Sequence, residues 1–64
     1  MKYIIKNMDT GQYLYSGRVF FEWTPDIYYA RVFKGIKGAT NTLNQIRTKA
    51  NCKILGIEMK EIEL

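Results

Sequence analysis

The sequence contains no histidine, one cysteine and one proline, and these absences exclude several kinds of site. Without histidine, the thiol of Cys52 has no imidazole to activate it, and no group of residues has the spacing of a zinc site. A lone cysteine cannot form an intramolecular disulfide, which is typical of proteins from a reducing compartment. We therefore expect a cytoplasmic protein without a metal or cofactor, in which Cys52 is a small apolar residue at a helix end.

Long apolar runs are also missing. No stretch approaches the roughly 20 residues that a membrane span needs, so we expect no contact with a membrane. Paired carboxylates of the kind that perform general acid and base catalysis are not evident, and a chain of 64 residues has little room for an enclosed dry pocket. The composition therefore predicts one domain, residues 1–64, with a thin core and without enzyme activity.

Acidic residues are absent between Asp26 and Glu58, although the whole chain carries a net charge of +4. A purely basic span of this kind favours docking onto nucleic acid or onto an acidic protein surface. No ribonucleoprotein motif, zinc-finger spacing or P-loop accompanies the charge. Candidate contacts for nucleic acid or another anion are the six cations of the span, Arg31, Lys34, Lys37, Arg47, Lys49 and Lys53.

The first third of the chain has the pattern of a three-stranded β-meander. Residues 2–7 and 12–15 are rich in strand-forming residues, and Asp9-Thr10-Gly11 between them suits a hairpin tip with Asp9 bonding forward and Gly11 at positive φ. Ser16-Gly17 then predicts a second turn. It leads to a strand over 18–23 with Val19, Phe21 and Trp23 on one face.

Two helical segments follow. Thr24-Pro25-Asp26 predicts a short helical turn capped by Thr24, with Ile27 and Ala30 facing inward and an extended segment at Val32 and Phe33. The main helix is expected over 38–51. Its apolar stripe consists of Ala39, Leu43, Ile46 and Ala50.

The alternation of Leu55, Ile57 and Met59 with polar neighbours predicts a final strand that is buried on one side. Together these patterns predict an α+β fold, an antiparallel sheet of about four to five strands with one main helix across one face. The predicted core consists of Ile5, Leu14, Val19, Phe21, Trp23, Ala30, Phe33, Ala39, Leu43, Ile46, Ala50, Leu55 and Ile57.

Aromatic residues make up 14% of the sequence, which is more ring area than one small sheet face and one helix readily cover. Some rings are therefore expected in an interface, and a homodimer is favoured over a monomer. Ordinary tyrosines on a sheet surface are the alternative. The acidic end at Glu58, Glu61 and Glu63 either pairs with the basic span of a second copy or protects a sheet edge. Candidate partner-binding residues are Tyr13, Tyr15, Arg18, Tyr28, Tyr29 and Arg31.

The order of these signals resembles a group of small, mostly uncharacterised bacteriophage and prophage proteins. The resemblance rests on Tyr3-Ile4-Ile5-Lys6-Asn7, Thr10-Gly11-Gln12-Tyr13-Leu14, Trp23-Thr24-Pro25-Asp26, Ala30-Arg31-Val32-Phe33 and Gly38-Ala39. It covers nearly the whole chain, and its motifs are structural. It implies a phage-encoded accessory protein that acts in the cytoplasm of a bacterial host.

Three functions remain open on this basis. The favoured one is stoichiometric inhibition of a host protein complex, such as an anti-phage defence system, without catalysis. The second is a nucleic-acid-binding accessory protein that uses the basic span. The third is a nucleotide or small-ligand sponge, with anion contacts where Lys34-Gly35-Ile36-Lys37-Gly38 leads into the main helix.

Overall fold

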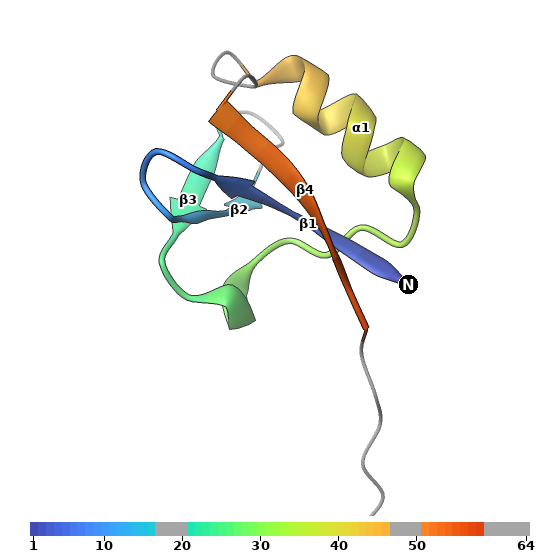
Figure 1. Ribbon diagram of the computed structural model, residues 1–64, viewed down its shortest axis with the longest axis horizontal. Helices are drawn as coiled ribbons and strands as arrows, with labels where there is room; N and C mark the ends of the chain where they lie inside the picture. The colour runs from blue at the N-terminus through green and yellow to red at the C-terminus, as the bar shows by residue number, and fades with distance from the viewer. Residues whose placement is uncertain (17–20, 47–50, 59–64) are drawn as a thin grey trace, which may run out of the picture.

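The computed structural model describes residues 1–16, 21–46 and 51–58, which form one four-stranded antiparallel sheet with a single α-helix packed on it. The strands are β1 (Lys2–Asn7), β2 (Tyr13–Ser16), β3 (Glu22–Thr24) and β4 (Cys52–Ile57). Their order is β3-β2-β1-β4, so the last strand returns to lie beside the first (Figure 1). The predicted α+β architecture is confirmed.

The turn between β1 and β2 is fixed by Asn7 and Gly11. The side-chain oxygen of Asn7 accepts hydrogen bonds from the backbone N–H of Asp9 at 2.9 Å and of Thr10 at 3.4 Å. Gly11 has φ of 72°, as expected, and its N–H donates to the Asn7 carbonyl at 2.8 Å. The residue whose side chain accepts hydrogen bonds from the backbone of the turn is therefore Asn7, because Asn7 stands at the end of β1. The sequence had suggested Asp9 for this role.

The third strand is shorter than predicted. β3 spans three residues, and Phe21 precedes it. Its pairing with β2 shifts register between Leu14 and Ser16, which is the signature of a β-bulge. The predicted strand at 18–20 and the core position Val19 lie outside the described residues.

The predicted helical turn after β3 is a 3₁₀ helix, η1 (Ile27–Tyr29). Its N-cap is Asp26, whose carboxylate accepts from the Tyr28 N–H at 2.9 Å, so the prediction of Thr24 as cap was wrong. Thr24 acts one step earlier, because its hydroxyl oxygen accepts from the Asp26 N–H at 3.2 Å. Three residues give too short a helix to turn both Ile27 and Ala30 inward. Ala30 is buried and Ile27 is 44% exposed.

The main helix, α1 (Ile36–Gln45), begins two residues before the predicted start and ends well before Asn51. Gly35 is extended and acts as its N-cap without a side-chain hydrogen bond. Ile46 leaves the helix in an extended conformation and is buried there. The early end has two physical reasons: the helix is rich in Thr and Asn, which favour helices weakly, and no basic residue stands in its last turn.

The core cluster lies between α1 and one face of the sheet. Residues of β1 and β4 that stand directly opposite each other point to the same face of the sheet. Ile5 stands opposite Ile54, and Asn7 stands opposite Cys52, so these four side chains share the face that α1 covers. The buried members of the cluster are Ile5, Leu14, Phe33, Ala39, Ile46 and Cys52, with Tyr3, Phe21, Trp23, Leu43 and Ile54 packed against them. Cys52 is therefore apolar core, as expected, but it begins a strand rather than ending a helix. Ala50 lies outside the described residues.

The opposite face of the sheet is also closed at its centre, which the sequence did not predict. Ile4 pairs with Leu55 on that face and has no exposed surface. The segment after η1 runs beside β1, along the edge of β1 that β4 does not pair with (Figure 1). It is held by two backbone bonds between Tyr3 and Phe33, at 2.9 and 2.8 Å, and by one from the Arg31 N–H to the Leu14 carbonyl. Ala30, in this segment, is the other buried residue outside the helix-side cluster.

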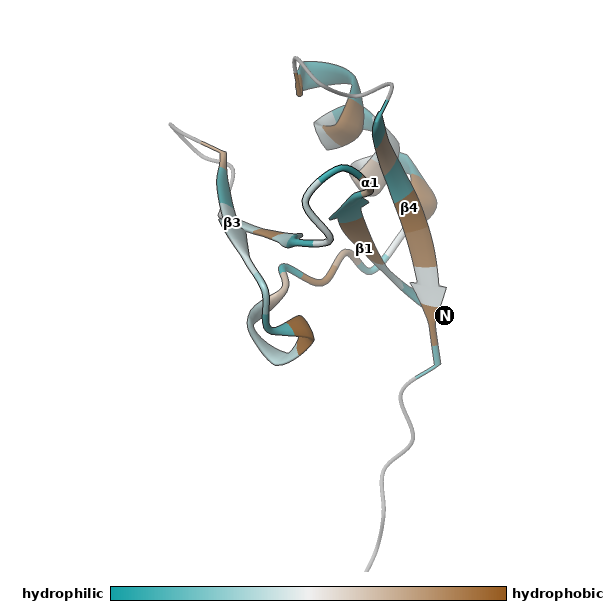
Figure 2. Cartoon of the chain, turned by 60° about the vertical axis from the view of Figure 1, so that its left-hand side comes forward, coloured by the Kyte–Doolittle hydropathy of each residue, from teal (hydrophilic) through white to brown (hydrophobic). Residues whose placement is uncertain are grey.

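Hydropathy does not alternate strictly along β4 (Figure 2), because Ile54 and Leu55 are adjacent apolar residues that point to opposite faces and are both half-buried. Leu55 and Ile57, both predicted as core, are half-buried. Met59 lies outside the described residues. The strand thus contributes Cys52 and Ile54 to the helix side and leaves Leu55 and Ile57 on the partly open side.

Candidate binding surface

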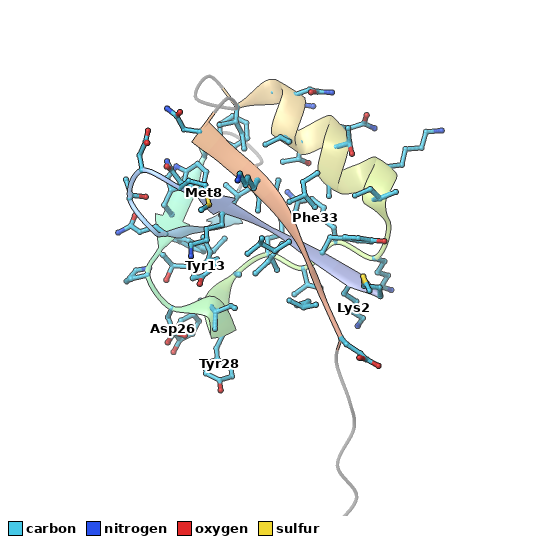
Figure 3. The ribbon with its side chains drawn as sticks, in the orientation of Figure 1. Lys2, Met8, Tyr13, Asp26, Tyr28 and Phe33 are labelled. Carbon is cyan, nitrogen blue, oxygen red and sulfur yellow. The ribbon has the colours of Figure 1, made fainter. Side chains whose placement is uncertain are left out.

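Exposed aromatic and apolar side chains gather around η1. Tyr28 is 92% exposed, Tyr29 70% and Ile27 44%. The Tyr28 ring points away from the sheet, as Figure 3 shows. η1 stands on the side of the sheet away from α1 in both Figure 1 and Figure 2, so this surface is separate from the helix-side core.

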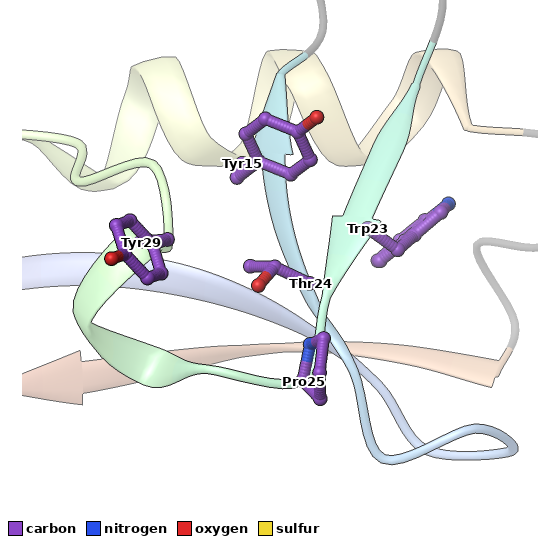
Figure 4. Close-up of a pocket in the computed structure, with 5 residues that line it drawn as sticks. All are labelled: Tyr15, Trp23, Thr24, Pro25 and Tyr29. Carbon is purple, nitrogen blue, oxygen red and sulfur yellow. The ribbon is translucent and has the colours of Figure 1, made fainter.

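Tyr29 and Tyr15 line an open hollow of about 340 Å³ between η1 and the β2–β3 hairpin (Figure 4). Thr24 and Pro25 line it from the end of β3, and Trp23 completes the lining. The β-bulge in β2 lies at Tyr15, which is 44% exposed. A bulge re-aims the side chain it carries, and here it presents Tyr15 to the hollow.

The ring of Trp23 lies on the other side of β3 from the Thr24 side chain (Figure 4). Consecutive residues of a strand point to opposite faces, and Trp23 pairs with the buried Leu14 and packs on the core cluster. The two tyrosines are therefore the aromatic walls of the hollow. Trp23 supports the hollow from behind.

The carboxylate of Glu22 determines the electrostatics at this place. Hydrogen bonding to Glu22, together with its negative charge, raises the pKa of the Tyr15 hydroxyl above its ordinary value of 10.0. The hydroxyl therefore stays protonated at neutral pH. It is a hydrogen-bond donor on the rim of the hollow and not a base.

The other residues proposed for partner binding are distributed around this surface. Tyr13 is half-buried, pairs with Thr24, and has the Lys6 ammonium 5.6 Å from its ring centroid. The Arg31 guanidinium lies 4.8 Å over the Phe33 ring and is thus directed at the protein's own surface. Arg18 lies outside the described residues. Of the six candidates, the structure brings Tyr15 and Tyr29 together at the hollow, and Tyr28 is next to Tyr29 on η1.

Among the residues that the structure describes, the cations of the basic span do not form one group. Lys34 and Lys37 are exposed where the chain enters α1, beside the Tyr3 end of β1, to which Phe33 is bridged. Lys53 is exposed at the other end of β1, where it pairs with Lys6. Arg47 and Lys49 lie outside the described residues. The candidate anion contacts described by the structure are thus divided between two ends of the sheet.

Among residues 1–16, 21–46 and 51–58, no three His, Cys, Asp or Glu side chains gather to hold a metal ion. Within the same ranges, no helix has the length and apolarity to cross a membrane.

Sequence reasoning selected the tyrosines but missed the rest of the hollow. Thr24 and Pro25 were interpreted as helix-start signals, and they also form part of its wall. Nothing in the sequence indicated that Glu22 and Tyr15 meet, because the contact depends on the β2–β3 pairing and its bulge.

Comparisons with protein-family models, with curated proteins and with solved structures gave no match.

Proposed function

We propose that the chain is a small binding protein that acts stoichiometrically, by covering a surface of another protein, with the η1 surface as its contact. This surface consists of Tyr15, Ile27, Tyr28 and Tyr29. The observation that carries the proposal is the exposure of three consecutive large apolar residues, Ile27 to Tyr29, on a helix that buries none of them. Tyrosines of this kind supply large contact areas with few rotatable bonds and are over-represented among residues that dominate binding energy.

The way η1 is built supports a contact role. The Thr24 and Asp26 side chains fix the turn before the helix, and the Ala30 N–H closes it on the Ile27 carbonyl at 3.1 Å. The tyrosines are thus presented on a short segment held at both ends. A preformed segment loses less conformational entropy on binding than a loop that orders only in the complex.

The resemblance to phage accessory proteins directs the choice of target. A phage protein that inhibits a host complex, such as an anti-phage defence system, would act in the bacterial cytoplasm and needs no chemistry of its own. We accordingly propose a host protein complex as the partner. The partly open face at Leu55 and Ile57 and the exposed η1 surface also favour a homodimer, which light scattering over a concentration series tests directly.

Capture of host proteins by the tagged chain, followed by mass spectrometry, tests the function. The variant Tyr28→Ala/Tyr29→Ala removes the most exposed rings and is expected to lose a partner that the wild type retains. Lys34→Ala/Lys37→Ala is the matched control, because it also truncates two exposed residues next to a helix, and it should retain that partner. Each candidate is then purified and titrated alone, and its activity is measured with and without the chain.

Two results would contradict the proposal. One is loss of the partner by the lysine variant with full retention by the tyrosine variant. The other is binding that disappears steeply between low and moderate salt, since nucleic-acid binding releases counterions and an aromatic protein contact does not. Either result would assign the contact to the basic residues in place of the tyrosines.

A further inference from the structure

We propose that the hollow between Tyr15 and Tyr29 receives an arginine side chain of the protein partner, with the guanidinium against a tyrosine ring and its charge balanced by Glu22. The inference rests on the proposed function and specifies the chemistry that the same surface recognises. It is a statement about one anchor residue of the partner.

The shape of the hollow fits a flat group on a long stem. Two tyrosine rings, one from β2 and one from η1, stand across an opening that has Thr24 and Pro25 at its side (Figure 4). Both rings are accessible, because Tyr15 is 44% and Tyr29 70% exposed. A guanidinium is planar and delocalised, and it stacks on aromatic faces more readily than the strongly hydrated ammonium of lysine.

Charge also favours a cation at this place. The chain carries a net charge of +4, so most of its surface repels one. The described carboxylates are Asp9, Glu22, Asp26 and Glu58, and two of them flank the hollow in sequence. Glu22 contacts the Tyr15 hydroxyl and Asp26 follows Pro25 directly. Asp26 is engaged as the cap of η1, which leaves Glu22 as the carboxylate that meets the incoming charge.

The protein already uses the same interaction within its own chain. The Arg31 guanidinium lies 4.8 Å over the Phe33 ring. Arg31 is directed at Phe33 and does not line the hollow, so the cation that we propose for the hollow comes from the partner. The Thr24 hydroxyl oxygen, which accepts from the Asp26 N–H, adds an oxygen acceptor of the kind that guanidinium N–H groups bind.

Titration with short peptides, followed by ¹H–¹⁵N NMR of the folded chain, tests the inference. The probe is acetyl-Gly-Arg-Gly-amide. Its controls are the citrulline peptide, which has the same shape without charge, and acetyl-Pro-Pro-Pro-amide, which tests the hollow as a proline-binding groove. The arginine peptide is expected to shift the amide signals of Tyr15, Thr24 and Tyr29 in a saturable manner at millimolar concentration, and the two controls are not.

Two pairs of variants identify the contact. Tyr29→Leu and Glu22→Gln should each weaken the arginine peptide about three- to fivefold. Tyr28→Leu alters the neighbouring exposed tyrosine, which does not line the hollow, and Glu58→Gln makes the same charge change at the end of β4. Both of these should leave the affinity unchanged.

The inference is overturned if the citrulline peptide binds as well as the arginine peptide, if the proline peptide alone binds, or if no peptide shifts these signals. Its failure is distinguishable from failure of the proposed function. If Tyr28→Ala/Tyr29→Ala still abolishes capture of a host protein while the arginine peptide does not bind, the function stands and the anchor chemistry is wrong. If the arginine peptide binds as described and no host protein depends on the tyrosines, the hollow is confirmed and the function is wrong.

Discussion

Truncation of Ile4 gives the sharpest test of the fold, because the structure buries both Ile4 and Ile5 completely, at 0% exposure, on opposite faces of one strand. An alternating strand with one open face would leave one of the two exposed. Ile→Ala removes three carbon atoms, or about 2.4 kcal/mol at 0.8 kcal/mol each, and the cavity that remains brings the expected loss to about 2–5 kcal/mol. At roughly 0.05–0.15 kcal/mol per residue, a chain of 64 residues has only about 3–10 kcal/mol to lose.

The milder variants Ile4→Val and Ile5→Val are therefore the informative pair. Each should cost about 0.5–1.5 kcal/mol, which lowers the urea midpoint by about 0.5–1.5 M if the slope is near 1 kcal/mol per molar. The fluorescence of Trp23 reports unfolding, because it is the single tryptophan and it packs on the core cluster. Ile27→Val is the control. Ile27 is 44% exposed, and its truncation should cost less than about 0.5 kcal/mol.

The decisive comparison is between the two neighbours on β1. If Ile4→Val behaves like Ile27→Val while Ile5→Val shows the full loss, then the second face of the sheet is not closed over Ile4. The two-sided core would be wrong. Equal losses at Ile4 and Ile5 would confirm that the sheet is covered on both sides.

Three further predictions concern the turn, the helix start and the tyrosine on the hollow. Gly11→Ala should cost about 1 kcal/mol in urea unfolding, because φ is 72° and nothing lies within 4 Å of an added Cβ, so backbone strain is the whole effect. Gly35→Ser should instead add about 0.5–1 kcal/mol to the unfolding free energy, because the N-cap of α1 is extended, has open space around it and lacks a side-chain hydrogen bond. An unchanged or lower melting temperature would contradict this prediction. The pKa of Tyr15, followed by NMR, should lie above 10.0 and fall toward it in Glu22→Gln. Because the folded-state pKa is raised, the contribution of this contact to stability is present below pH 10.0 and is lost as the pH rises through the raised pKa.

The sequence determined the parts of this protein that depend on local geometry. Gly11 has the positive φ that its turn required, and the stripe on α1 buries Ala39 and packs Leu43 against the core cluster. The first and last strands lie where β-forming residues predicted them, since their composition favours an extended backbone. The tyrosines at 15, 28 and 29 were recognised as candidates because tyrosine combines large apolar area with a polar tip.

Only the tertiary structure decided which residues of distant segments meet. Ile4 is buried although it lies on the face of β1 opposite the helix-side cluster, and the segment after η1 pairs with the second edge of β1 through the hydrogen bonds between Tyr3 and Phe33. Helix α1 ends at Gln45 where Ile46 turns into the core, a choice that helix propensity alone does not determine. The hollow between Tyr15 and Tyr29 exists because a bulge in β2 and a short 3₁₀ helix bring together residues far apart in the chain. Periodicity reports the surroundings of one segment, and a binding site arises from the packing of several.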